Sequence, residues 1–190
     1  MAEEPGPYDY TGLHAFVFID HVPETDSPYA VVQRLRGELK GPPEGPVVFA
    51  GDVVGPYQAF AHLRVEEGDL SGLLDLINGQ LREQGVRCKY SVETKVYKDP
   101  SGRVIGTKRG TPEIIALVSV DVRAGMIDSV LDQLGELDAF RGASVVTGDF
   151  DILLQLGGET LDEVLEVGMG QLQRIDGIKR TSTALLDGRR

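Results

Sequence analysis

Gly-Glu-Leu stands at residues 37–39 and again at 135–137, and Gly-Gln-Leu stands at 79–81 and again at 170–172. Each tripeptide lies in or at the end of an amphipathic helical pattern. Within each half, a Gly-Asp followed by an alternating strand pattern lies between Gly-Glu-Leu and Gly-Gln-Leu. A repeat of this length is a whole small domain and not a solenoid unit. The sequence therefore predicts two related domains in tandem.

Hydrophobic periodicity gives the two halves the same order of elements. In the first half, strands are expected at 15–20, 47–50, 57–65 and 86–94, and helices at 29–39 and 70–83. In the second half, strands are expected at 114–122, 143–147, 150–156 and 178–186, and helices at 127–137 and 161–174. The order β-α-β-β-α-β predicts an α+β protein with two ferredoxin-like domains, each with a four-stranded antiparallel sheet, of the dimeric α+β barrel type.

Loop composition sets the expected boundaries. Residues 1–12 are rich in Pro and Gly and predict an N-terminal arm, followed by the first domain at 13–94. Residues 95–112 contain the turn sequence Asp-Pro-Ser-Gly and predict a hairpin linker. The second domain is expected at 113–190.

Composition excludes several classes of function. The 190 residues carry a formal net charge of −11, which repels nucleic-acid phosphates, so no direct DNA or RNA binding is expected. The single Cys88 excludes an internal disulfide and a multi-cysteine metal site, and no cofactor or metal is expected. The start lacks a signal-peptide pattern, and no apolar run approaches the ~20 residues that cross a membrane. A cytoplasmic protein without membrane contact is expected.

Three phenylalanines mark the sheet face that points away from the helices. Strand alternation places Phe16, Phe18 and Phe60 on this face of the first domain, and such a concentration of apolar surface needs a cover. The cover is either the other repeat or a second copy of the chain. We therefore expect sheet-on-sheet packing, and a homo-oligomer that associates through sheet faces.

The second half resembles the ligand-binding (RAM) domain of the Lrp/AsnC regulators. The resemblance is carried by Ala-Leu-Val-Ser-Val at 116–120, Thr-Gly-Asp-Phe-Asp-Ile-Leu-Leu at 147–154 and Ile-Asp-Gly-Ile-Lys-Arg-Thr-Ser-Thr at 175–183. It covers residues 113–187, and the first half is similar only more distantly. Nothing before Leu13 has the pattern of the helix-turn-helix that such regulators also carry. The resemblance implies a doubled, stand-alone ligand-binding module.

The resemblance further implies a non-enzymatic sensor that binds a small effector, typically an amino acid, between associated domains. The ligand-binding positions that it carries over are Gly148, Asp149, Phe150, Asp151, Thr181 and Thr183. The carboxylate of Asp151 would accept hydrogen bonds from an ammonium group, and the alternative is a purely structural turn. Gly55-Pro56-Tyr57-Gln58 replaces this corner in the first half, so about one effector per chain is expected.

Two other functions remain open from the sequence. The first is an enzyme of the dimeric α+β barrel group, in which His62 or acidic residues of the open sheet face handle a small organic substrate or haem. Gln58, Phe60 and His62 are the second-choice pocket for the effector. No second imidazole is expected beside His62, since the spacing of His14, His21 and His62 predicts no shared metal. The second is a structural assembly module.

Overall fold

The computed structural model describes residues 12–24, 26–38, 47–97 and 114–186, and both halves have the predicted βαββαβ order. The first half contains β1 (Leu13–His21), α1 (Pro28–Glu38), β2 (Val47–Val54), β3 (Ala59–Val65), α2 (Leu70–Gln80) and β4 (Arg87–Tyr97). The second contains β5 (Ile114–Val122), α3 (Ile127–Gly135), β6 (Phe140–Gly148), β7 (Ile152–Gly158), α4 (Leu161–Leu165) and β8 (Ile178–Leu186). Residues 1–11 of the arm predicted at 1–12, and residues 98–112 of the linker predicted at 95–112, lie outside the described residues.

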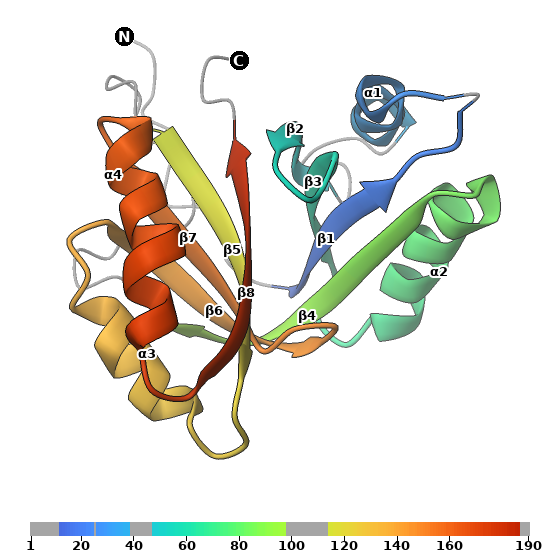
Figure 1. The fold of residues 1–190 in the computed structure, drawn as a ribbon. Coiled ribbons are helices and arrows are strands. Elements are labelled where there is room, and N and C mark those ends of the chain that lie inside the picture. Colours follow the sequence, from blue (N-terminus) through green and yellow to red (C-terminus); the bar gives the residue numbers. More distant parts are fainter. Residues whose placement is uncertain (1–11, 25, 39–46, 98–113, 187–190) are drawn as a thin grey trace, which may run out of the picture.

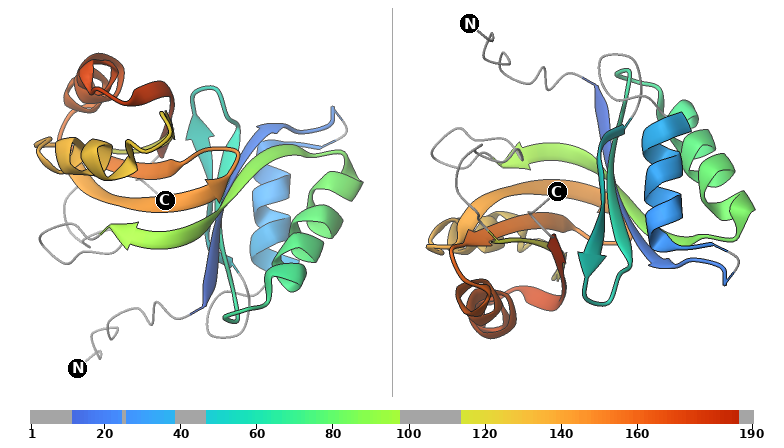
Figure 2. Two further views of the ribbon diagram at one scale, coloured as in Figure 1. Left: turned by 90° about the horizontal axis from the view of Figure 1, so that it is seen from below. Right: turned by 90° about the horizontal axis from the view of Figure 1, so that it is seen from above.

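The two sheets close into one barrel with the strand order β1-β3-β2-β8-β5-β7-β6-β4. Every strand pair is antiparallel, and the pairs β4–β6 and β2–β8 join the halves. We call these two pairs the β4–β6 joint and the β2–β8 joint. The helices cover the outside, with α1 and α2 against one sheet and α3 and α4 against the other (Figures 1 and 2). The predicted fold class is confirmed.

The barrel encloses an apolar lumen to which both halves contribute. The rings of Phe16 and Phe18 have no exposed area, and Phe60 is 3% exposed. The full lumen cluster consists of Phe16, Phe18, Val53, Tyr57, Phe60, Leu117, Val146, Phe150, Leu153 and Ala184. The inner sheet face of each half is thus covered by the other half of the same chain, which is one of the two arrangements expected from the sequence. Because each face packs on the other, the expected homo-oligomer stays a prediction that would involve other surfaces.

Equivalent backbone hydrogen bonds relate the two halves position by position. The N–H of Gln58 donates to the carbonyl of Ile19 at 2.7 Å, and the N–H of Asp151 donates to that of Val120 at 3.0 Å. Gln58 and Asp151 therefore occupy the same place in the two halves. Residues that follow them by equal steps along β3 and β7 also correspond.

The elements differ from the predicted ranges where the halves meet and where glycine interrupts a helix. β2 continues to Val54 and β4 to Tyr97, because residues 53–54 pair with β8 and residues 95–97 pair with β6. The helix expected at 161–174 is divided into α4, a π-helical turn at Glu166–Gln171 and a 3₁₀ turn at Leu172–Arg174. Gly168 and Gly170, which have weak helix propensity, lie inside the π-helical turn.

Candidate ligand groove at the joint of the two halves

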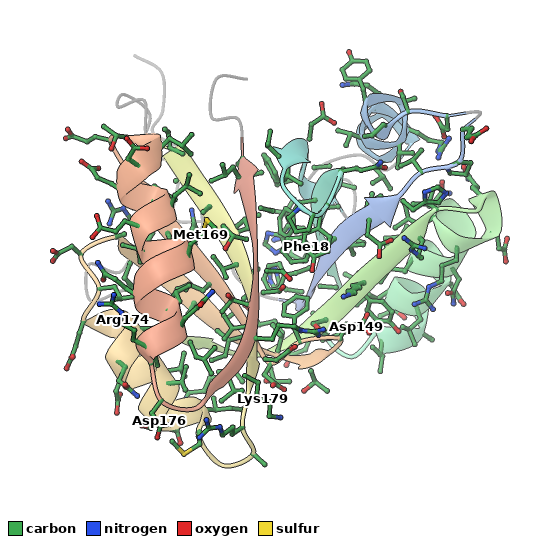
Figure 3. The ribbon with its side chains drawn as sticks, viewed as in Figure 1. Phe18, Asp149, Met169, Arg174, Asp176 and Lys179 are labelled. Carbon is green, nitrogen blue, oxygen red and sulfur yellow. The ribbon has the colours of Figure 1, made fainter. Side chains whose placement is uncertain are left out.

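The corner between β6 and β7 contacts β4 through a reciprocal pair of hydrogen bonds. The N–H of Asp149 donates to the carbonyl of Tyr90 at 3.1 Å, and the carboxylate of Asp149 accepts from the N–H of Tyr90 at 2.8 Å. Gly148 has φ +150°, and a Cβ there would lie 2.5 Å from the carbonyl oxygen of Tyr90. Glycine is thus required for the corner to approach β4. Figure 3 shows Asp149 at this contact between the halves.

A groove of about 620 Å³ lies beside this contact. Apolar side chains from α2 and β4 make up much of its wall, and the β6–β7 corner closes one side. Its full lining is Leu13, Gly68, Leu70, Leu74, Arg82, Tyr90, Val92, Glu93, Thr94, Thr147, Gly148 and Asp149. We call it the joint groove. Its volume lies in the range of small-molecule sites.

Charged groups of both signs border the joint groove. The guanidinium of Arg82 lies 5.2 Å from the ring centroid of Tyr90, a cation–π contact that holds the cation at the wall. Asp149 brings a carboxylate to the same lining, whereas the pairing of Glu93 with Val146 turns the Glu93 side chain toward the lumen. Burial raises the pKa of the nearby Cys88 thiol although Arg82 opposes the shift, so this sulfur stays protonated and unreactive at neutral pH.

The structure places the next two residues of the corner outside the joint groove. Phe150 is 4% exposed and points into the lumen, where its ring meets that of Phe18 edge-on at 5.6 Å. Asp151 accepts a hydrogen bond from the N–H of Val122 through Oδ2 at 2.7 Å. This bond uses one acceptor site of the carboxylate, and the others are left for the predicted contact with an ammonium group.

Thr181 and Thr183 belong to β8, which forms the β2–β8 joint. A Cβ on Gly168 would lie 3.5 Å from the hydroxyl oxygen of Thr183, so Thr183 faces the helical side of the sheet. A Cβ on Gly55 would lie 2.7 Å from the carbonyl oxygen of Thr183, which reproduces the approach of Gly148 to Tyr90. The ligand-binding positions predicted from the sequence are therefore divided between two equivalent joints. Only Gly148 and Asp149 line the joint groove.

The second-choice pocket predicted from the sequence is not continuous. Gln58 is exposed at the β2–β3 corner, whereas Phe60 and His62 are each 3% exposed inside the lumen. His62 does have a second imidazole beside it, contrary to expectation: Nδ1 of His14 and Nε2 of His62 are 2.8 Å apart. Sequence spacing missed this pair because the β1–β3 register brings together residues 48 positions apart.

At the end of the barrel where β1 finishes, polar groups close the lumen. The carboxylate of Asp121 pairs with Arg180 at 2.7 Å, and Asp20 pairs with Arg87 at 2.8 Å. A recess beside the Asp121–Arg180 pair, bordered also by Tyr57 and Lys89, has a volume of about 10 Å³. This is about the space that one water needs, so no organic ligand fits here.

In residues 12–24, 26–38, 47–97 and 114–186, no group of three or more His, Cys, Asp or Glu side chains is placed to hold a metal ion. Within the same ranges, no helix has the length and hydrophobicity needed to span a membrane.

The comparisons with known proteins agree with this architecture. Residues 115–186 match the sequence profile of the Lrp/AsnC ligand binding domain. An uncharacterized HTH-type transcriptional regulator of Pyrococcus furiosus is 35% identical over 101 residues, which cover 53% of this chain and 68% of that protein. A similar regulator of Pyrococcus horikoshii is 31% identical over 74 residues, 39% of this chain and 47% of that protein. The second half is thus an Lrp/AsnC ligand-binding domain, and the chain belongs to the Lrp/AsnC family.

A solved structure extends the similarity in fold to both halves. The siroheme decarboxylase NirDL, crystallised with an iron-uroporphyrin III analogue, superimposes with a TM-score of 0.64 and 10% sequence identity. The match covers 91% of this chain and 70% of that one. At this identity the similarity concerns the fold alone.

Proposed function

We propose that this protein is a regulatory sensor whose small-molecule effector binds in the joint groove. The proposal rests on the two reciprocal hydrogen bonds between Asp149 and Tyr90. They hold the corner that contains Gly148 and Asp149 in the wall of the joint groove, which has a volume of about 620 Å³. Membership of the Lrp/AsnC family supports a regulatory ligand-binding role. The cytoplasm is the compartment we propose for it.

The effector that best suits the lining is an amino acid with an apolar side chain. Arg82 offers a cation for the carboxylate, and the carboxylate of Asp149 offers an acceptor for the ammonium group. Leu70, Leu74 and other apolar residues of the lining would contact the side chain. Because the β2–β8 joint has Pro56 where the β4–β6 joint has Asp149, we propose about one effector per chain.

A thermal-shift screen against the standard amino acids tests this proposal. An effector at about 100 times its Kd adds ~2.7 kcal/mol of apparent stability, which is easily measured. We expect apolar amino acids to raise the unfolding temperature and acidic ones to have no effect. If no amino acid raises it, the proposed effector class is wrong.

We propose that regulation acts through a partner and not through direct DNA contact. The net charge of −11 opposes binding to phosphates. A gel-shift titration at physiological salt should show no sequence-selective duplex binding below micromolar concentration. Selective binding in that range would contradict this part of the proposal.

We further propose that the protein is not an enzyme. The similarity in fold to a decarboxylase at 10% identity transfers no chemistry. If the protein were instead a barrel enzyme that handles haem, the purified protein would have a tetrapyrrole absorption band. We expect a colourless preparation whose absorption spectrum does not change when haem is added. A structural assembly module would respond to none of the small molecules in the screen.

A further inference from the structure

The lumen contains a set of polar side chains that does not belong to the joint groove. His14, His62, Ser144 and Gln155 are at most 7% exposed. Each lies two residues along its strand from a member of the lumen cluster, and strand alternation therefore points it into the barrel. We call these four residues the lumen site.

Gln155 is the member that indicates a missing partner. Its side chain is 7% exposed, and its Oε1 is buried without a hydrogen-bond partner among the described residues. A buried acceptor left unpaired costs about 1–3 kcal/mol, and such groups in proteins usually have a partner. The oxygen therefore marks a place for a donor that the protein itself does not supply.

His62 occupies in the first half the position that Gln155 occupies in the second. His62 follows Gln58 by four residues along β3, and Gln155 follows Asp151 by four along β7, so the two occupy equivalent positions. His62 contacts His14 at 2.8 Å, and its ring centroid lies 4.8 Å from that of Phe16. Burial first, and then the charge of His14, lowers the pKa of His62 to about 3. The imidazole of His62 is therefore neutral at physiological pH.

The composition of the lumen sets the charge of an occupant. The buried polar residues of the described chain are His14, His62, Ser91, Ser119, Ser144 and Gln155, with no Asp, Glu, Lys or Arg among them. Two charged side chains of opposite sign, Arg64 opposite His14 and Glu93 opposite Val146, also face the lumen, but both are partly exposed. A charged group placed deep in the lumen would lose its hydration without a fully buried counter-charge, which is unfavourable. The aromatic wall of Phe16 and Phe60 favours a flat or apolar body.

We propose that the lumen site binds a small uncharged molecule that has an aromatic or apolar body and an N–H or O–H group donating to Oε1 of Gln155. This ligand differs in charge from the amino acid proposed for the joint groove, and it occupies a different place. The chain would then have two separate ligand sites, one outside and one inside the barrel.

Phenol and anisole are matched probes for this site, because methylation removes the O–H donor and keeps the ring. Thermal unfolding of the wild type should shift upward with phenol, and anisole should need at least a tenfold higher concentration for the same shift. In Gln155→Met the unpaired acceptor is gone, so the ligand-free unfolding temperature should be equal or higher and the phenol shift should be lost. Gln58→Met, the same change at an exposed position, should keep the phenol shift.

Several results would overturn the proposal. Equal phenol shifts in the wild type and in Gln155→Met would place phenol elsewhere, and no shift in the wild type would remove the evidence for a site. A lower ligand-free unfolding temperature in Gln155→Met would show that Oε1 has a partner within the protein. A crystal structure with phenol present that shows only an ordered water on Gln155 would also contradict it. A stabilising amino acid should act equally on both variants, which separates this test from that of the joint groove.

Discussion

Gly148 lies where the β6–β7 corner passes over β4, and this contact sets its tolerance to substitution. In Gly148→Ala the new Cβ would lie 2.5 Å from the carbonyl oxygen of Tyr90, at φ +150°. We expect the free energy of unfolding to fall by about 1–3 kcal/mol or more, measured by urea titration. Gly142→Ala is the control on the same strand, since a Cβ at Gly142 meets nothing within 4 Å, and it should change stability by less than ~0.5 kcal/mol. Equal effects of the two changes would contradict the geometry of the corner.

Asp151 has a structural contact beside its predicted role in ligand binding. Asp151→Ala leaves the N–H of Val122 without its acceptor at 2.7 Å, and we expect a loss of about 1–3 kcal/mol in the free energy of unfolding. Asp151→Asn keeps an acceptor oxygen and should recover most of that loss. If Asp151→Asn also weakens effector binding while stability is recovered, the predicted ammonium contact gains support. Unchanged stability in Asp151→Ala would contradict the structural contact.

Sequence reasoning found the corner residues but not their separate roles. The Gly-Asp-Phe-Asp pattern at 148–151 predicted a ligand-binding corner, with a structural turn as the alternative, and Gly148 and Asp149 do line the joint groove. It could not show that Phe150 turns into the lumen, because that depends on which strand of the other half the corner meets. The division of Gly148 and Thr183 between two joints has the same cause.

At the scale of elements, sequence periodicity identified all eight strands of the barrel, and the ends of β2 and β4 were the weak point. Their last residues pair only across the joints, with β8 and β6. Local patterns do not contain this information, because the pairing partners are distant in sequence. α4 is shorter than predicted because it continues as the π-helical turn at Glu166–Gln171, which contains two glycines. Hydrophobic periodicity does not distinguish such a turn from an α-helix.

The histidine pair between β1 and β3 makes stability depend on pH. The pKa of His62 is about 3 in the folded protein, below its ordinary value of 6.5, so the unfolded state binds more protons between these values. The stabilising contribution is present above pH 6.5 and is lost as pH falls toward 3, with a slope of up to ~1.4 kcal/mol per pH unit. Urea titrations across this range should show a smaller slope in His62→Gln, which places the residue type of Gln155 at the equivalent position. Identical slopes would show that His62 is not held neutral.

At the scale of the whole molecule, each half completes the other. The lumen cluster takes residues from both sheets, so neither half buries its inner face alone. A fragment of residues 113–190 would expose Leu117, Phe150 and Leu153, and we expect it to form dimers by closing a barrel from two copies. Sedimentation equilibrium distinguishes this from a stable, soluble monomer, which would contradict the account of the lumen.

The central claim is that one effector binds per chain in the joint groove, and calorimetric titration tests it most directly. With the most stabilising amino acid from the screen, the wild type should bind about one molecule per chain. Arg82→Ala should weaken binding by ~1.5–3 kcal/mol, the value of a hydrogen bond to a charged group. Arg123→Ala, which removes an exposed arginine paired with Asp176 outside the groove, should bind as the wild type does. Two equivalent sites per chain, or equal affinities in Arg82→Ala and Arg123→Ala, would contradict the claim.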